Sequence, residues 1–333
     1  MSTRGVLGQG SATGIFYAKG TAHMKDRLVT LIGGGGFLGR YVAQALLARG
    51  ARVRIAQRDP RRAFFLKPLG GLGQTQFVAA DLSKPESIAH AVAGSDAVVN
   101  LVGILNGNFQ KIQVEGARIV AEAAAQAGVG ALVHVSAIGA DPASDSAYGR
   151  SKGEGEAAVR AAFPAATILR PSIVFGREDQ FVNRFAAMIA SAPVVPVLRA
   201  GTKFQPVYVG DVAEAVVAAL SHPEMAAGKV LELGGSDVLT MGDLVRWIAK
   251  ATGRKRAIVE LPDAIGATIA TFGFLPGAPI TADQWKMLAR DNVVSGEDGL
   301  KTFGIVPTPL DSVASGWLVR YRKGGRFAAP TAA

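Results

Sequence analysis

Short apolar segments alternate with segments of helical periodicity along the first half of this 333-residue chain. Each apolar segment is four to six residues long and rich in Val, Ile, Leu and Ala, as in strands buried on both faces of a sheet. We expect strands at residues 28–32, 52–57, 76–80, 97–102, 131–135 and 166–169. Helices are expected at residues 37–49, 84–93 and 114–127. The pattern predicts an α/β fold with a doubly wound parallel sheet and right-handed crossovers.

From Asp211 onward the pattern predicts a smaller lobe that is mostly helical. The chain is expected to return to the sheet once or twice, at residues 229–233 in the clearest case. Asp211 and Thr240 are expected to be the N-caps of the first two helices of this part of the chain. The helices are expected at residues 212–220, 241–250, 281–290 and 309–321.

Residues 261–275 form a largely apolar stretch that allows three interpretations. The stretch could be a substrate lid, or a helix that offers its apolar face to a membrane surface or a partner subunit. In that second interpretation Arg254 to Arg256 would lie beside anionic headgroups. In the third interpretation the helix packs on its own lobe.

A glycine-rich turn joins the first strand to the first helix. Gly33, Gly36 and Gly39 have the spacing GxxGxxG, in the position where the chain would begin a βαβ unit. A backbone in contact with a pyrophosphate has no room for Cβ, and the free N–H groups at a helix N-terminus attract the phosphate charge. We expect cofactor contacts along the turn at Gly33, Gly35, Gly36, Phe37, Leu38 and Gly39.

This turn gives the chain a provisional division into four segments. Residues 1–24 are expected to be a disordered leader, and residues 327–333 a disordered tail. Between them we expect an NAD(P)-binding Rossmann domain at residues 25–210 and the smaller lobe at residues 211–326.

The residues after the second strand bear on the choice of cofactor. In this fold the end of that strand faces the adenosine ribose, where a carboxylate binds a free 2′-hydroxyl and an arginine accommodates a 2′-phosphate. Arg58 stands there, followed by Asp59, Arg61 and Arg62. Asp59 would suit NAD(H), but the three arginines favour NADP(H).

Further cofactor contacts are expected at the ends of the later strands. Asp81 and Leu82 close the third strand, where an aspartate can lie beside the adenine amino group; the alternative is that Asp81 caps the following helix. At the nicotinamide end we expect Leu101, Val102, Gly103 and Pro171.

Tyr148 and Lys152 are four residues apart and therefore share one helix face. A lysine ammonium close to a phenol lowers the pKa of the phenol, which can then exchange a proton while a hydride moves to or from the cofactor. Ser136, at the end of the preceding strand, could bind a substrate carbonyl. Ser136, Tyr148 and Lys152 are the candidate catalytic residues, and the last two are also candidate cofactor contacts.

The composition excludes several other classes. The chain has no cysteine, so disulfides and thiolate catalysis are excluded, and its four histidines show no metal-ligand spacing. His134 is expected to be a hydrogen-bonded core residue. No apolar run is long enough to cross a membrane. The net charge of +10 comes without a nucleic-acid recognition element, so an anionic cofactor, lipid surface or acidic partner is expected instead.

Two later segments carry a resemblance to a known family. Residues 175–185 and 205–213, together with residues 100–103 and 134–136, resemble the nucleotide-binding accessory subunit of respiratory complex I and its bacterial relatives. Those proteins are atypical members of the extended short-chain dehydrogenases, which include epimerases and dehydratases. Gln113 is a departure, because many extended enzymes have asparagine in this helix, and it argues against a proton relay there.

The resemblance implies bound NADPH and a scaffold or quinone-associated role, with complex I subunits, quinone or an anionic membrane surface as partners. It implies a cytoplasmic protein, or one held peripherally on the inner face of the energy-transducing membrane. The residues that match the family's cofactor positions are Gly33, Gly36, Gly39, Arg58, Asp81, Tyr148, Lys152 and Pro171. The alternative function is an active NADPH-dependent reductase or epimerase-like enzyme that uses Ser136, Tyr148 and Lys152 on a carbonyl or sugar-nucleotide substrate.

Overall fold

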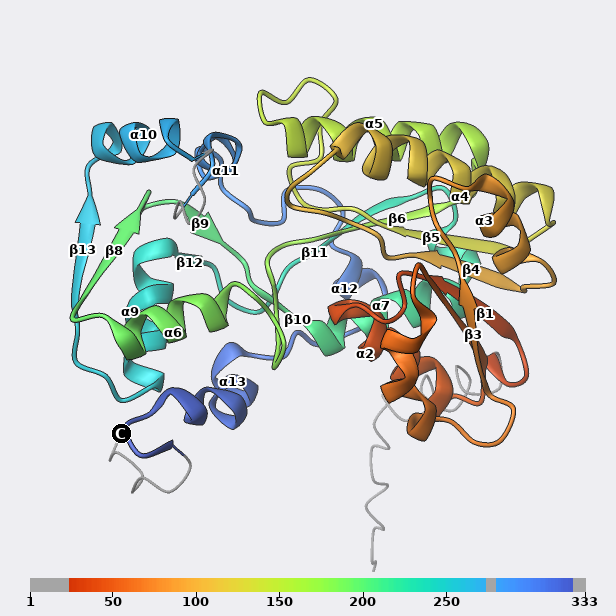
Figure 1. Ribbon diagram of the computed structural model, residues 1–333, viewed down its shortest axis with the longest axis horizontal. Helices are drawn as coiled ribbons and strands as arrows, with labels where there is room; N and C mark the ends of the chain where they lie inside the picture. The colour runs from red at the N-terminus through yellow and green to blue at the C-terminus, as the bar shows by residue number, and fades with distance from the viewer. Residues whose placement is uncertain (1–23, 274–279, 326–333) are drawn as a thin grey trace, which may run out of the picture.

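The computed structural model describes residues 24–273 and 280–325, which form two lobes (Figure 1). The larger lobe is built on a seven-stranded parallel sheet with the order β11-β6-β5-β4-β1-β2-β3. This doubly wound order confirms the expected fold. The strands are β1 (Leu28–Ile32), β2 (Arg52–Gln57), β3 (Thr75–Ala79), β4 (Ala97–Asn100), β5 (Ala131–Val135), β6 (Thr167–Pro171) and β11 (Val230–Leu233).

Helices cover both faces of this sheet. α2 (Phe37–Ala48) and α7 (Val209–Ser221) lie against one face, and α3 (Pro85–Val92), α4 (Gly116–Gln126) and α5 (Ala147–Ala162) lie against the other (Figure 1). The strands β1, β4 and β5 are apolar at most positions because successive side chains point into opposite layers, whereas β2 alternates Arg52 and Arg54 with Val53 and Ile55.

The middle of β5 illustrates this alternation. Val133 packs into the core beneath α2 and α7, while its neighbour Leu132 packs into the core beneath α3 and α4. Both side chains are almost fully buried. The continuous apolar runs of the sequence therefore reflect a sheet that is covered on both sides.

The smaller lobe has a core of its own. β8 (Val194–Leu198) pairs in parallel with β13 (Ala257–Leu261), and α6 (Val182–Ser191), α9 (Met241–Ala251) and α13 (Leu310–Leu318) pack around them. Figure 1 shows this lobe beside the edge of the large sheet that carries β11 and β6.

Several short elements connect the two lobes or complete them. They are η1 (Pro60–Leu69), η2 (Gln110–Glu115), β7 (Val174–Phe175), β9 (Lys203–Phe204), β10 (Val207–Tyr208), α8 (Pro223–Ala226), β12 (Leu239–Thr240), α10 (Asp263–Thr271), α11 (Ala282–Met287), α12 (Gly299–Thr302) and η3 (Val319–Tyr321). Within the described residues, no helix is long and apolar enough to cross a bilayer.

The chain passes between the lobes more than once. β11 returns to the large sheet at Val230–Leu233, as expected, but α7, which also follows residue 210, packs on that sheet too. α6 and β8 precede residue 210, yet they belong to the smaller core. Packing therefore cuts across the division expected between residues 210 and 211.

The two expected N-caps have different outcomes. Thr240 caps α9 as expected, because its Oγ1 accepts a hydrogen bond from the Asp243 N–H at 3.0 Å. The expectation for Asp211 is wrong, because α7 already begins at Val209. The Asp211 carboxylate instead accepts hydrogen bonds from the N–H and Oγ1 of Thr308, at 2.7 and 2.8 Å, and so ties α7 to the C-terminal segment.

The alternative interpretation of Asp81 as a helix cap is also wrong. The N-cap of α3 is Lys84, and it makes no side-chain capping bond. The Asp81 carboxylate instead accepts hydrogen bonds from the N–H and Oγ of Ser83, both within 2.9 Å. These bonds hold the turn between β3 and α3 in shape and lower the pKa of Asp81.

The stretch at 261–275 is divided between two elements. Leu261 closes β13, and helix α10 occupies Asp263–Thr271 with most of its side chains exposed. Phe274 and Leu275 lie outside the described residues, as do the expected tail and all of the expected leader except Met24.

Candidate dinucleotide-binding site

Each glycine of the GxxGxxG turn meets a different steric requirement. Gly33 has a φ of +83°, a left-handed conformation that favours glycine, and its N–H donates to the Ala56 carbonyl at 2.8 Å. A Cβ on Gly39 would stand 2.5 Å from the Gly34 carbonyl oxygen, so glycine allows α2 to approach the turn. A Cβ on Gly36 would meet only the Gly33 carbonyl oxygen, at 3.2 Å, and would otherwise point into open space.

That open space lies at the start of α2. Gly36 is the N-cap, no side chain caps the helix, and its first turn contains no acidic residue. The first N–H groups of a helix lack partners within the helix, and the helix dipole favours negative charge there. An uncapped helix end with a bare glycine in front of it fits a pyrophosphate.

Beside the turn lies a cavity of about 480 Å³ lined by Gln57, Arg58, Asp59 and Arg62. Gln57 connects it to the turn, because its Oε1 accepts from the Gly35 N–H at 3.1 Å and its Nε2 donates to the Asp59 carbonyl at 2.7 Å. A Cβ on Gly35 would overlap Gln57 Oε1 at 2.2 Å, which explains the glycine.

The charged groups around this cavity differ in whether they are free to bind a ligand. The Asp59 carboxylate accepts hydrogen bonds from the N–H and Nε of Arg61, at 3.2 and 2.9 Å, and this pairing lowers the pKa of Asp59. Arg58 and Arg62 are both exposed and line the cavity. Cations therefore dominate the place where the adenosine ribose is expected.

The other predicted cofactor contacts approach the turn from neighbouring strands. A Cβ on Gly33 would stand 3.1 Å from Val102 Cγ2 and 3.6 Å from the Leu101 carbonyl carbon, so the end of β4 lies against the turn. Pro171 closes β6 and is buried. The side chain of Leu82 packs in the core beneath α3 and α4, so only its backbone is free to face a ligand.

Tyr148 and Lys152 lie on α5, near the carboxyl end of β5. The Lys152 side chain is almost fully buried, and its Nζ donates to the Val135 carbonyl at 3.3 Å. A Cβ on Gly103 would stand 3.2 Å from this Nζ, so the loop after β4 lies beside the ammonium group. Burial lowers the pKa of Lys152 to about 8, against the opposing effect of Glu156.

Ser136 directly follows the carbonyl that Lys152 binds. It is buried, and its Oγ has no hydrogen-bond partner among residues 24–273 and 280–325. A buried hydroxyl group without a hydrogen-bond partner destabilises the fold, and an atom of a bound ligand could supply the partner. Burial raises the pKa of Tyr148 to about 12, and the Phe109 ring meets the Tyr148 ring edge-on with 6.1 Å between centroids.

His134 is buried behind this group, as expected for a core residue. Its Nδ1 is 3.1 Å from Asn100 Nδ2, and the Asn100 Oδ1 accepts from the Val102 N–H at 3.2 Å. Burial, reinforced by the Lys152 ammonium, lowers the pKa of His134 to about 3. The imidazole is therefore neutral, with Nδ1 accepting the hydrogen bond from the amide.

Gln113 lies in a π-helical turn, η2, where the sequence predicts the beginning of an α-helix. Its Nε2 donates to Ser151 Oγ at 2.8 Å, while its buried Oε1 has no hydrogen-bond partner. A Cβ on Gly155 would stand 2.3 Å from the Gln113 carbonyl oxygen, so α5 approaches η2 closely at this point. π-Turns often occur beside functional sites.

Sequence reasoning missed two contacts from the smaller lobe. The Asp283 carboxylate, from α11, accepts from the Ala147 N–H at 2.6 Å and from the Tyr148 N–H at 3.1 Å, and thus caps α5. Asn292 accepts from Ser172 Oγ at 2.7 Å and donates to the Ile138 carbonyl at 3.4 Å. Residues so distant in sequence give no local signal of these contacts.

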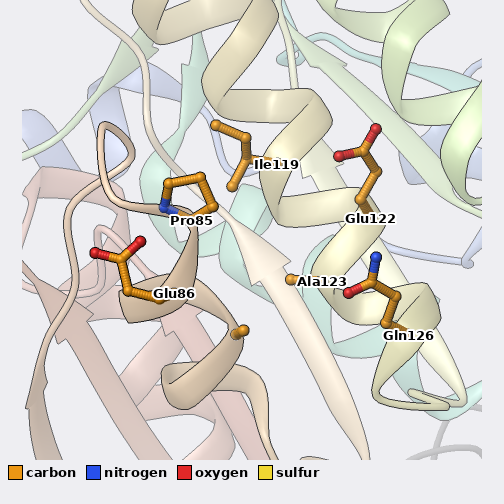
Figure 2. A pocket seen from close by; sticks show the side chains of 7 residues that line it. Pro85, Glu86, Ile119, Glu122, Ala123 and Gln126 are labelled. Carbon is orange, nitrogen blue, oxygen red and sulfur yellow. The ribbon is translucent and has the colours of Figure 1, made fainter.

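A second cavity, of about 210 Å³, lies between α3 and α4. Figure 2 shows Glu86 of α3 and Glu122 of α4 on either side of it, with Ile119 and Ala123 between them. None of the predicted site residues lines this cavity.

A parallel sheet in this order, with a glycine turn at its first crossover, defines a dinucleotide-binding Rossmann protein. Residues 29–234 match the NAD dependent epimerase/dehydratase family, and the chain belongs to this family.

Curated relatives confirm the resemblance to the complex I subunit. The chain is 36% identical over 313 residues to mitochondrial NADH dehydrogenase (ubiquinone) 1 alpha subcomplex subunit 9 of Mus musculus, covering 91% of this chain and 82% of the mouse protein. The Arabidopsis thaliana protein of that name is 33% identical, over 98% and 82% of the two chains. Ceramide reductase of Caulobacter vibrioides is 31% identical, over 76% and 80%.

Solved structures support the fold. The Citrobacter triphenylmethane reductase complexed with NADP(H) matches with a TM-score of 0.71 at 19% identity, over 87% of this chain and 99% of that one. The Escherichia coli NADPH-dependent quinone oxidoreductase complexed with NADPH matches with a TM-score of 0.70 at 21% identity, again over 87% and 99%. At these identities the likeness shows the fold alone.

Alanine at Gly36 and at Gly39 should have opposite effects on binding and stability. Gly36→Ala should change the free energy of unfolding by less than about 1 kcal/mol, yet weaken NADPH binding at least about tenfold, because its methyl group faces the helix end. Gly39→Ala should destabilise the fold by about 1–3 kcal/mol, because its methyl group overlaps backbone. Urea unfolding and NADPH titration measure both effects, and undiminished NADPH binding by Gly36→Ala would contradict the site.

The buried His134 should make the fold sensitive to acid. The folded-state pKa of about 3 lies below the usual 6.5, so the unfolded chain binds the proton first as the pH falls. The stability associated with the neutral imidazole is complete above about pH 6.5 and declines toward pH 3, on the order of 4 kcal/mol in all. His134→Asn keeps an acceptor for Asn100 and should flatten this decline in urea unfolding; a decline as steep as that of the unchanged chain would contradict the assignment.

Proposed function

We propose that the chain is an NADP(H)-binding scaffold, associated with a quinone-reducing respiratory complex and holding NADPH as a structural element. The observation that carries the proposal is the uncapped N-terminus of α2 beside a cavity lined by Arg58 and Arg62. An anionic dinucleotide matches both features, since its pyrophosphate suits the helix end and a 2′-phosphate suits the two guanidinium groups.

The residues of the site would divide the cofactor between them. The main chain of Gly33 to Gly39 would hold the pyrophosphate, and Asp81 would lie toward the adenine. Leu101 to Gly103 and Pro171 would border the nicotinamide end, and Lys152 would bind its ribose. When bound, the nicotinamide would supply a hydride.

The scaffold role is supported by the relatives. The mouse and Arabidopsis proteins are named as complex I subunits, and this chain covers 82% of each. We infer a similar assembly here, with the protein lying peripherally on the inner face of the energy-transducing membrane. Quinone or an anionic membrane surface would then be close to the bound protein.

A second candidate function is carbonyl reduction. It is favoured by the retention of Ser136, Tyr148 and Lys152 around the carboxyl end of β5, and by a relative named ceramide reductase. In this function the Ser136 hydroxyl, which lacks a protein partner, would bind the carbonyl oxygen and the Tyr148 phenol would deliver the proton.

Replacement of Arg58 should separate the two cofactors. Arg58→Ala should weaken NADPH at least about tenfold, because a charge-assisted bond to phosphate is lost, and should leave NADH nearly unchanged. Isothermal titration with both nucleotides measures the difference. Arg118→Ala, on the outer face of α4, is the matched control and should bind both as before. Equal weakening of NADPH and NADH by Arg58→Ala would overturn the assignment of Arg58 to the 2′-phosphate.

Cofactor exchange should distinguish the scaffold from the reductase. We expect the purified protein to carry NADPH that dialysis and excess NADP⁺ do not remove, and to fractionate with the respiratory complex at low salt. Rapid exchange together with multiple turnovers on a carbonyl panel would instead establish the reductase. In that case Tyr148→Phe should abolish turnover and leave NADPH binding intact, which would assign the proton donor.

A further inference from the structure

The segment 60–73, which contains η1 and the loop after it, has an unusually apolar exposed surface. It follows β2 directly and so begins beside the cavity lined by Arg58. Four large apolar side chains are exposed within it, and Leu72 is exposed completely. Their exposed fractions are 41% for Phe64, 47% for Phe65, 45% for Leu69 and 108% for Leu72.

All charged residues of the same segment are basic. It contains Arg61, Arg62 and Lys67, all exposed, and no acidic residue. Asp59, which precedes it, is already paired with Arg61. Because that pair neutralises Arg61 and Arg62 lines the cofactor cavity, Lys67 is the cation of this segment that shares a surface with the exposed apolar side chains.

The segment is anchored from within, so this surface is held in place. Ala63 and Leu66 are fully buried in the core beneath α2. The Phe64 ring packs edge-on against Phe77 of β3, with 5.3 Å between centroids. These contacts hold one side of the segment against the core and leave the other side exposed.

Cations lie directly over the exposed rings. Lys67 Nζ is 3.7 Å from the centroid of Phe64, and the Arg40 guanidinium carbon is 4.8 Å from that of Phe65. Lys67 thereby places a positive charge beside an apolar group at the surface, whereas the Arg40 guanidinium is also paired with the Glu178 carboxylate, at 3.3 Å. An anionic lipid surface can bind the cation and the apolar side chain together, because its headgroups attract the positive charge and its acyl region accommodates the apolar group.

Leu72 is the most exposed of the four apolar side chains. It lies between Gly71 and Gly73, and Gly73 has a φ of +77° that suits a tight turn. A fully exposed leucine leaves its whole apolar surface in water, which is costly compared with burial. A bulky apolar side chain at the tip of a small-residue loop can enter a lipid layer without rearrangement of the fold.

We propose that the segment 60–73 docks the protein on an anionic phospholipid surface, with Leu69 and Leu72 entering the interface and Lys67 paired with headgroup phosphate. The inference rests on the membrane-side position in the proposed function and identifies the surface that would make the contact. Lipid is favoured over a protein partner because Lys67 stands between exposed apolar side chains on a short segment, and anionic headgroups and acyl chains complement the two kinds of group without a shaped groove.

Binding to vesicles tests the proposal with the full chain and its NADPH. The protein should sediment with vesicles that contain phosphatidylglycerol and much less with phosphatidylcholine alone. The double variant Leu69→Ser, Leu72→Ser should bind the anionic vesicles at least about tenfold more weakly. Lys67→Glu should bind them at least about fivefold more weakly.

Two controls match these changes elsewhere on the surface. Val306→Ser removes another highly exposed apolar side chain. Lys255→Glu reverses an exposed charge in the basic run Arg254–Arg256. Both should bind as the unchanged protein does. Equal binding by the segment variants, equal loss in the controls, equal binding to neutral vesicles, or capture by an acidic protein without vesicle binding would overturn the proposal.

The same preparations separate this inference from the proposed function. NADPH content and thermal unfolding should be the same in all variants, because the changed side chains lie outside the cofactor cavity. Retained NADPH with no vesicle binding would reject the docking surface alone. Vesicle binding by the segment without retained NADPH would reject the cofactor-holding role and support the docking surface.

Discussion

The close approach of α2 to the turn before it is the constraint on which the larger lobe depends. Gly39 lets the helix backbone come against Gly34, and this contact brings Val42 and Leu46 into the core over β1 and β2. The same approach aims the first N–H groups of the helix out of the protein beside Gly36. The packing of α2 and the proposed anion binding therefore depend on one geometry, so a side chain at Gly39 that moved the helix would also move the proposed binding groups.

The candidate site also contains a buried cation, the ammonium group of Lys152, whose removal from water costs free energy. The Lys152 ammonium is buried near the neutral His134 and donates a hydrogen bond to the Val135 carbonyl, while the Glu156 carboxylate partly offsets the cost of burial. Burial disfavours the charged ammonium, which is why its pKa falls. Such an arrangement is poor for stability alone, and it is reasonable where an anionic or hydroxyl-rich ligand completes the site.

The sequence anticipated the elements whose cause is local. Strands with two covered faces appear as continuous apolar runs, and the glycine turn is recognisable because its conformational requirements are local too. Asp211 was misplaced because its true partner, Thr308, lies far along the chain. The π-turn at Gln113 was not predicted, because it lies against Gly155 of α5 and the periodicity of the sequence does not indicate that contact.

The hydrogen bonds from α5 to Asp283 restrict which sequence changes the smaller lobe can tolerate. The smaller lobe supplies a carboxylate to the backbone N–H groups of Ala147 and Tyr148, in addition to the local cap from Ser146, so a distant segment helps to hold the first turn of α5. A different module in place of the smaller lobe would therefore need a hydrogen-bond acceptor at that junction. It would also need partners for the larger lobe where Asn292 bonds Ser172 and where Thr308 bonds Asp211.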